Sequence, residues 1–280
     1  MRIDLIIYHQ DNVFLNQRGN SLKIISWNVN GIRAVQKKGF LEWLEKESPD
    51  ILGVQETKAH PDQLDVFLLH PAGYETHWAW STVKKGYSGV AIFTKKNPVN
   101  VQRGFGIKKF DDEGRVIIAA YPEFVFLNIY FPNGKASDER LQYKMDFYHE
   151  TLKFTKALKT QGRKVIICGD YNTAHKEIDL ARPKENEGTS GFLPVERAWL
   201  DKWIADGQVD IFREFHKEPG QYSWWDMKTG ARERNIGWRI DYHFVSQDLV
   251  PQVKKAWHLT DIMGSDHCPI GIELKDQENG

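Results

Sequence analysis

Acid, amide or histidine side chains stand where five separate apolar runs of the sequence end. They are Asn28 and Asn30, Gln55 and Glu56, Asp170 and Asn172, Asp241, and Asp266 with His267. A single residue of this kind is usually a helix cap or a turn former. Five such groups at the ends of strands that share a sheet favour a functional site, because converging carboxylates repel one another unless a cation or a substrate group compensates their charge.

The residue types in this set restrict the chemistry that they can perform. Carboxylate and amide oxygens without cysteine ligands suit a hard cation such as Mg²⁺ or Mn²⁺. One histidine is too few for a typical zinc site, and the remaining histidines lack a comparable acidic cluster on the same motif. A metal ion, an acid able to activate water and a histidine beside negative charge together predict hydrolysis of a phosphate ester.

Short apolar runs bounded by Gly, Pro, Asn or Asp must position these side chains, and such runs are typical of β-strands. They cover residues 22–28, 50–55, 89–94, 115–121, 124–131, 164–170, 240–246 and 268–274. We expect amphipathic helices over residues 40–48, 136–160 and 194–207. Ser137 would cap the second of these helices, and Pro194 and Gly207 would begin and end the third. The mixture predicts sheets covered by helices, with functional loops at the strand ends.

The bulk composition is that of a folded protein and disfavours several classes. With 41% hydrophobic and 27% charged residues, the chain is unlike a disordered one. No apolar run approaches the roughly 18 residues that a membrane helix requires, and the first residues have no signal-peptide cleavage site. Two cysteines are too few for a disulfide framework. We therefore expect a cytoplasmic protein with no membrane partner. The composition leaves the oligomeric state open, and a monomer is the expectation.

The balanced charge of the chain bears on its partner. Basic and acidic residues are equally frequent, so the formal net charge is zero. Many nucleic-acid binders are strongly basic, because contacts with phosphates supply most of their non-specific affinity. The balance thus argues mildly against a DNA substrate, but the charge on the binding face matters more than the total.

The organisation of the chain favours one domain. It contains no short-period repeats, low-complexity tracts or Ser/Gly-rich linkers. Residues 1–21 precede the first strand and include a polar segment, HQDNVFLNQRGNS. We interpret them as an N-terminal extension with no assigned function, and residues 22–280 as a single domain.

Nine motifs occur in the order shown by exonuclease III-type abasic (AP) endonucleases of the endonuclease/exonuclease/phosphatase superfamily. They are SWNVNGIRA, LGVQETK, GYSGVAIF, DDEGRVI, NIYFPNG, GDYNTAH, SGFLPVER, GWRIDY and GSDHCPI. The resemblance runs from about Leu22 to Leu274. It implies a catalytic domain of the α/β class, a four-layer α/β sandwich in which two packed mixed β-sheets are flanked by helices.

The resemblance implies a metal site in this chain. Glu56 would be the principal ligand of Mg²⁺, or of Mn²⁺, with Asn28, Asn30 and Asp266 in its neighbourhood. Some relatives have Asp where this chain has Asn30, which removes one negative charge and leaves the number of direct ligands open.

The resemblance also implies catalytic roles. Asp170 looks like the group that orients and deprotonates the attacking water, and Asn172 would position it beside the phosphate. His267, held by Asp241, looks like a phosphate-facing histidine whose imidazolium stabilises transition-state charge. Tyr130 resembles a tyrosine that contacts the phosphate or the leaving oxygen. Tyr130 as a strand anchor and Asp241 as a cap remain the alternatives.

Three further residues match contacts with the substrate in this family. Asn133 and Asn186 resemble asparagines that contact the substrate, and Arg33 resembles an arginine that contacts the DNA backbone. At Thr189 some relatives have another asparagine, so one hydrogen bond near the phosphate differs here.

A tryptophan-rich segment points to the substrate. Trp224, Trp225, Trp238 and Ile240 lie close to Asp241 in the sequence. Family members that act on abasic sites use such a segment as a small apolar pocket for an extruded, base-free deoxyribose, which a normal nucleotide does not fit. The alternative is that these tryptophans are core residues, and Trp225 is the strongest candidate for that role.

The function implied is that of a DNA-repair phosphodiesterase. It would hydrolyse the backbone 5′ to abasic sites and leave a 3′-hydroxyl, with accompanying 3′–5′ exonuclease and 3′-end trimming activity. Its partner would be double-stranded DNA with abasic sites or blocked 3′ ends. The alternatives are a related metal-dependent phosphodiesterase for another phosphate ester, since the fold serves several substrates, and a non-catalytic DNA-binding module.

Overall fold

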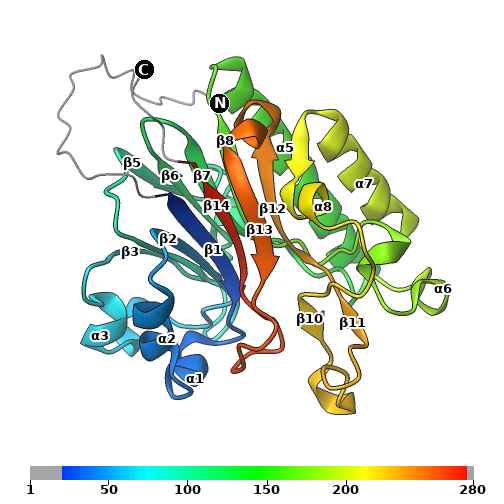
Figure 1. Ribbon diagram of the computed structural model, residues 1–280, viewed down its shortest axis with the longest axis horizontal. Coiled ribbons are helices and arrows are strands. Elements are labelled where there is room, and N and C mark those ends of the chain that lie inside the picture. Colours follow the sequence, from blue (N-terminus) through cyan, green and yellow to red (C-terminus); the bar gives the residue numbers. More distant parts are fainter. Residues whose placement is uncertain (1–20, 276–280) are drawn as a thin grey trace.

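The computed structural model describes residues 21–275, and its framework is two β-sheets that face each other (Figure 1). The first sheet has the strand order β13-β14-β1-β2-β4-β3. In that order its strands are Val253–His258, Ile270–Leu274, Leu22–Asn28, Ile51–Gln55, Val90–Thr94 and Glu75–Ala79.

The second sheet has the order β5-β6-β7-β8-β12-β9. In that order its strands are Asn100–Arg103, Val116–Ala120, Val125–Tyr130, Val165–Asp170, Asp241–Ser246 and Gln208–Asp210. A separate two-stranded hairpin, β10 (Trp224–Trp225) and β11 (Gly237–Trp238), projects below this sheet in Figure 1.

Helices form the outer layers. Helices α1, α2 and α3 lie beside the first sheet, and α5 and α7 lie beside the second (Figure 1). The α-helices α1 to α8 are Ile32–Gln36, Phe40–Glu47, Val66–Leu69, Lys108–Asp111, Asp138–Thr160, Pro183–Asn186, Pro194–Ala205 and Ile211–Phe215. The short 3₁₀ turns η1 to η4 are Pro61–Gln63, Glu177–Asp179, Met227–Thr229 and Gln247–Gln252.

The core lies between the sheets and beneath each helical layer. Ile92 of the first sheet and Phe126 and Ile166 of the second belong to one buried cluster between the sheets. Burying a side chain of this size stabilises the fold by about 1.5–3 kcal/mol. Two further clusters join each sheet to its helices, so the arrangement has four layers.

Strand direction brings polar residues to one edge of the sandwich. β1 runs parallel to β2, and β7 runs parallel to β8, so the carboxyl ends of each pair lie together. β12 is antiparallel to β8 and begins at the same edge, where Asp241 is the register partner of Asp170. β14 is antiparallel to β1, so the segment before β14 also arrives there.

The predicted four-layer α/β sandwich is confirmed, as are the eight predicted strands and three predicted helices. Ser137 caps α5, because its hydroxyl accepts a hydrogen bond of 3.3 Å from the N–H of Arg140.

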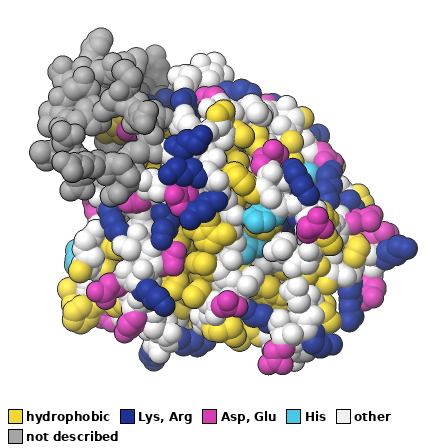
Figure 2. Space-filling view, in the orientation of Figure 1, with side chains coloured by type: hydrophobic (Ala, Val, Ile, Leu, Met, Phe, Trp, Pro, Cys, Tyr) yellow, Lys and Arg dark blue, Asp and Glu magenta, His cyan; other side chains and the backbone are white. Residues whose placement is uncertain are grey.

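Residues 1–20 of the expected extension lie outside the described residues, and the single domain over 22–280 stays a prediction. Within residues 21–275 no helix is long and apolar enough to cross a membrane. Figure 2 shows basic and acidic side chains mixed over the viewed face.

Candidate active site

Two similar turns begin the site, one at the end of each central strand. Asn28 ends β1 and accepts a hydrogen bond of 3.0 Å from the N–H of Asn30, while Asp170 ends β8 and accepts one of 2.7 Å from the N–H of Asn172. Asn30 and Asn172 have left-handed backbones, with φ of 49° and 50°. Asparagine tolerates this conformation better than most residues, so the two segments fold alike for a local reason.

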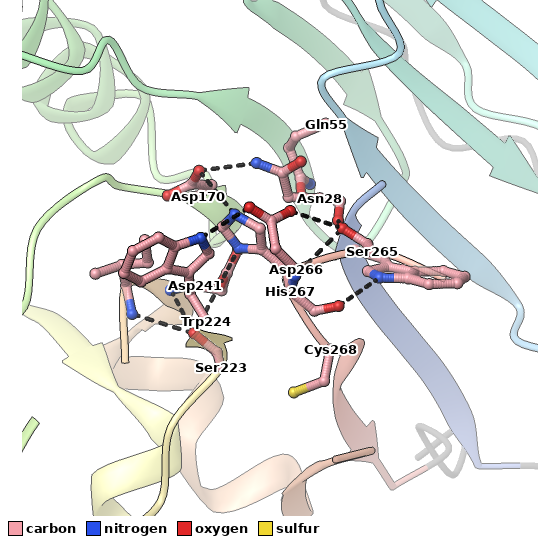
Figure 3. A network of polar contacts seen from close by, with 12 residues as sticks. Asn28, Gln55, Asp170, Ser223, Trp224, Asp241, Ser265, Asp266, His267 and Cys268 are labelled. Carbon is pink, nitrogen blue, oxygen red and sulfur yellow. Dashed lines mark hydrogen bonds and ion pairs between the residues drawn. The ribbon is translucent and has the colours of Figure 1, made fainter. Parts of the chain in front are cut away.

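Asp170 joins the polar cluster from the end of β8 (Figure 3). Its carboxylate accepts hydrogen bonds from the side-chain amides of Asn28 (2.9 Å) and Asn172 (3.3 Å), and Nε2 of His267 lies 3.9 Å away. Burial, followed by the negative charge of Asp241, raises the pKa of Asp170 to about 7. This carboxyl group can therefore gain and release a proton near neutral pH.

His267 is held in a fixed orientation. Its Nδ1 lies 2.8 Å from Oδ2 of Asp241, and the Ser223 hydroxyl donates to the same oxygen at 2.6 Å (Figure 3). The main chain of His267 bonds to the indole N–H of Trp27 and to Ser265 Oγ. Burial alone would lower the pKa of His267, but the charge and hydrogen bond of Asp241 raise it to about 10. The imidazole is thus a cation at neutral pH.

This electrostatic relation gives a prediction that needs no assay of activity. Asp241→Asn should lower the pKa of His267 by about 1–3 pH units, because a carboxylate in contact stabilises the imidazolium by that much. An NMR titration of the His267 ring measures it. The exposed Asp201, which pairs with His175, supplies a control: Asp201→Asn should leave the His267 titration unchanged. An unaltered pKa in Asp241→Asn would show that Asp241 does not govern the charge of His267.

Glu56 stands beside this pair at the end of β2. It accepts a hydrogen bond from Asn28 (2.9 Å), and Nζ of Lys58 lies 2.8 Å from its other oxygen. Glu56 and Lys58 both have left-handed backbones, with φ of 52° and 51°. Burial would raise the pKa of Glu56, but Lys58 and Asn28 outweigh burial and lower it. Glu56 is therefore ionised.

Asp266 closes the other side of the cluster. Its Oδ1 accepts a hydrogen bond of 2.9 Å from Asn30, and its Oδ2 accepts one of 3.0 Å from the indole of Trp224. The side-chain oxygen of Asn30 is bonded to the ammonium group of Lys58. A chain of contacts thus links Asp266 to Lys58 and Glu56.

Glu56, Asp170 and His267 offer ligand atoms that all lie within 4.8 Å of one another. The two carboxylates suit a divalent cation, whereas the protonated ring of His267 has no free lone pair to offer one. The ammonium of Lys58 on Glu56 shows that this position attracts positive charge. The other expected ligands, Asn28, Asn30 and Asp266, lie around this cluster, and their side-chain oxygens accept hydrogen bonds from neighbours, as those of Glu56 do. The acidic part of the cluster therefore fits a divalent cation, and Glu56 as its principal ligand stays a prediction.

Tyr130 ends β7 against a buried arginine. The Arg115 guanidinium lies 4.7 Å from the centre of the Tyr130 ring and pairs with Glu113 at 2.5 Å. Burial and the nearby charge of Glu56 raise the pKa of Tyr130 well above its ordinary value. A hydrogen bond to Glu56 acts in the same direction, so the hydroxyl keeps its proton at neutral pH.

An apolar wall adjoins the polar cluster. Trp224 and Trp238 are paired across β10 and β11, with ring centroids 6.4 Å apart, and they pack with Ile240 and Phe192. Both indoles are half-buried, and Trp224 lies 6.5 Å from the His267 ring. Trp225 is only 3% exposed, which confirms the expectation that it is a core residue.

Of the three residues expected to contact the substrate, one lies in the polar cluster and two lie away from it. Asn133 joins the site, because its side-chain amide donates to Oδ1 of Asn172 at 3.0 Å. Asn186 in α6 donates to the carbonyl of Arg182 at 2.8 Å, and Arg33 is exposed on α1. Among the hydrogen bonds of the described residues, none ties Asn186 or Arg33 to the cluster.

Two residues of the site were missed in the sequence. Lys58 pairs with Glu56, and its signal was present, because it follows Glu56 by two residues within LGVQETK. Ser223 donates to Asp241 from 18 residues away. A lone serine at that separation gives no pattern that could have identified it.

Comparison with known proteins assigns the chain to a family. Residues 25–267 match the model of the Endonuclease/Exonuclease/phosphatase family. An exodeoxyribonuclease from Bacillus subtilis is 45% identical over 90% of this chain and 98% of its own length. A DNA-(apurinic or apyrimidinic site) endonuclease from Dictyostelium discoideum is 43% identical over 90% of this chain and 70% of its own length.

A solved structure agrees with these relatives in fold. A 3′ phosphatase from Neisseria, bound to product DNA hairpin, superimposes with a TM-score of 0.83 at 28% identity, over 90% of this chain and 99% of the other. The segment that matches the family, residues 25–267, contains the residues of the polar cluster. The chain therefore belongs to the endonuclease/exonuclease/phosphatase family, in its branch of exodeoxyribonucleases and abasic-site endonucleases.

Proposed function

We propose that this chain hydrolyses the DNA backbone 5′ to abasic sites and leaves a 3′-hydroxyl, with 3′–5′ exonuclease and 3′-end trimming as accompanying activities. The main support for the proposal is that a polar cluster and an apolar wall lie side by side. The cluster is Glu56, Asp170 and His267, and the wall is Trp224 and Trp238. The cluster supplies hydrolytic chemistry, and the wall suits a sugar without a base. The activities named for the two relatives support the same assignment.

Asp170 is the proton acceptor in this mechanism. Its pKa of about 7 lets it take the proton of a water molecule as that water attacks phosphorus. Asn172 fixes the carboxylate through its main-chain and side-chain N–H groups. The new P–O bond forms as the bond to the 3′-oxygen of the preceding nucleotide breaks, and that oxygen becomes the 3′-hydroxyl once protonated.

His267 and Tyr130 act on the charge of the phosphate. The His267 imidazolium uses one N–H on Asp241 and presents the other to a non-bridging oxygen, where negative charge grows in the transition state. The protonated hydroxyl of Tyr130 supplies a second donor. A Mg²⁺ ion at Glu56 would add Lewis-acid stabilisation of the same charge when it is bound.

Metal dependence should be complete. Glu56→Gln should weaken Mg²⁺ binding much more than DNA binding, because a neutral amide is a poorer ligand for a hard cation than a carboxylate. Calorimetry with Mg²⁺ and a filter-binding assay with an abasic duplex measure the two affinities. Glu75→Gln, at a half-exposed carboxylate on β3, is the matched control and should change neither. Full cleavage of the duplex in excess chelator would contradict the requirement for a metal ion.

The apolar wall should determine selectivity. Trp224→Ala and Trp238→Ala should lower the ratio of abasic to intact cleavage, because they loosen the pocket around the sugar and make room for a base. Trp225→Ala is the control, since truncating a core tryptophan typically costs about 3–5 kcal/mol of stability. It should lower the melting temperature and leave the ratio alone. An unchanged ratio with collapsed stability in Trp224→Ala and Trp238→Ala would assign those two residues to the core instead.

An end-labelled duplex with one abasic analogue, incubated with and without Mg²⁺, tests the function itself. Cleavage 5′ to the lesion with a 3′-hydroxyl end, only in Mg²⁺, is the expected result. Binding without cleavage would instead favour the DNA-binding module. Neither binding nor cleavage would favour a phosphodiesterase for another phosphate ester.

A further inference from the structure

One fully buried ion pair joins helices α5 and α7 behind the site. Nζ of Lys144 lies 2.6 Å from Oε1 of Glu196, and both side chains are 0% exposed. Such pairs contribute little net stability, because desolvation offsets the attraction between the charges. The other contacts of the pair indicate which local structure it fixes.

Lys144 binds the turn that follows Asp170. Its ammonium group donates to the carbonyl of Asn172 at 2.7 Å and to Oγ1 of Thr173 at 2.8 Å. One helical turn later, the Tyr148 hydroxyl donates to the carbonyl of Tyr171 at 2.6 Å. Helix α5 therefore holds three successive residues of this turn, including the residue whose amide groups contact the Asp170 carboxylate.

Glu196 binds the segment that backs the apolar wall. Its carboxylate accepts hydrogen bonds from the N–H groups of Gly191 (2.6 Å) and Leu193 (3.0 Å) and from the hydroxyl of Ser190 (3.0 Å). Gly191 has φ of +101°, and a Cβ at this position would lie 3.3 Å from the ring of Trp238. The segment thus packs closely against the wall, and its positive φ together with this tight contact disfavours a side chain at position 191.

A direct bond joins the two halves. The carbonyl of Gly191 accepts a hydrogen bond of 2.8 Å from the N–H of Ala174, which follows Thr173 in the chain. We propose that the Lys144–Glu196 pair is a positioning unit that sets the Asn172 turn and the Trp238 wall relative to each other. The same buried ion pair then affects both the orientation of the attacking water, through the Asn172 turn, and the exclusion of intact nucleotides, through the Trp238 wall. The kinetic part of this proposal rests on the proposed function.

Kinetics of Lys144→Met, Glu196→Gln and the double variant test the unit. Because small misplacements of catalytic groups are costly, kcat on an abasic duplex should fall by roughly 10- to 100-fold. KM should change little, and the ratio of abasic to intact cleavage should fall in the same variants. Lys156→Met is the matched control, because Lys156 of α5 also pairs with the end of α7, at Asp206 (3.2 Å), three turns from the site. It should change none of these quantities.

A second measurement does not depend on activity. In protein labelled with 5-fluorotryptophan, the ¹⁹F signal of Trp238, assigned through Trp238→Phe, should move in Lys144→Met and in the double variant. The signal of Trp27, in the other sheet, should not. Leu158→Ala, a core truncation elsewhere on α5, controls for lost stability and should leave the Trp238 signal in place.

The outcomes separate the two proposals. If the wild type does not cleave abasic DNA, the proposed function fails, and the Trp238 signal alone decides whether the pair positions the wall. Unchanged kcat, ratio and Trp238 signal, with only a lower melting temperature, would overturn the positioning role. If a single-charge variant does not fold, Ser190→Ala keeps both charges and removes one bond to Glu196. A smaller drop in the ratio is then expected, and no drop would overturn the proposal.

Discussion

Asp170→Asn should lower turnover on an abasic duplex by roughly 10²- to 10⁴-fold, the contribution typical of a group that accepts a proton in the transition state. An amide has no lone pair basic enough to take the proton of the attacking water. Folding should persist, because Asp170 lies at the end of β8 and an amide of the same size replaces it. Single-turnover kinetics with saturating enzyme measure the effect, and Asp201→Asn should retain wild-type rates.

The same variant has a second signature in stability. The folded-state pKa of Asp170 is raised from its ordinary value to about 7, so the folded protein binds this proton more tightly than the unfolded chain does. In chelator, the wild type should therefore lose stability relative to Asp170→Asn as pH rises from about 4 to about 7, because ionising the buried carboxyl favours unfolding. Asp170→Asn should lack this loss. In the kinetic experiment, a near-wild-type turnover of Asp170→Asn on the abasic duplex would show that another group activates the water.

His267→Ala should reduce kcat by roughly 10²- to 10³-fold, the cost of removing one preorganised donor from a developing negative charge. KM should change less, because the imidazolium interacts most strongly with the transition state. Thio-substitution of a non-bridging phosphate oxygen should then slow the variant less than the wild type.

A double-mutant comparison tests how Asp241 acts. If Asp241 works by holding and charging His267, as their 2.8 Å contact indicates, then Asp241→Asn should slow the wild type and have little further effect on His267→Ala. Fully additive losses would give Asp241 an independent task and contradict the assignment.

Within the two six-stranded sheets, the strands that the sequence analysis did not predict have one property in common. They are β3, β5, β9 and β13, and each stands at the edge of a six-stranded sheet. Segments such as NVQR and VKKAWH bury few of their side chains, because an edge strand has one neighbour and faces solvent. Apolar runs identify strands that are buried on both faces, so the central strands were predictable and the edges were not.

The site was predictable to the extent that its groups lie at strand ends. Glu56 and Asp170 lie at the ends of β2 and β8, Asp241 begins β12, and His267 lies just before β14. Strand direction brings these positions together. Contacts that depend on the path of a loop, such as Ser223 on Asp241, have no periodicity in the chain. Lys144 was hidden for a different reason, because a lysine in a polar helix is ordinarily expected to face solvent.

The left-handed backbones around the site bear on how this protein would change under selection. Glu56 and Lys58 have φ of 52° and 51°, a conformation that costs an ordinary residue roughly 1–2 kcal/mol. Glycine at either position would relieve that cost and remove a charged group from the cluster. A laboratory population selected only for heat resistance should therefore accumulate substitutions at these two positions. A population screened for survival of DNA damage should keep both residues and gain its stability elsewhere.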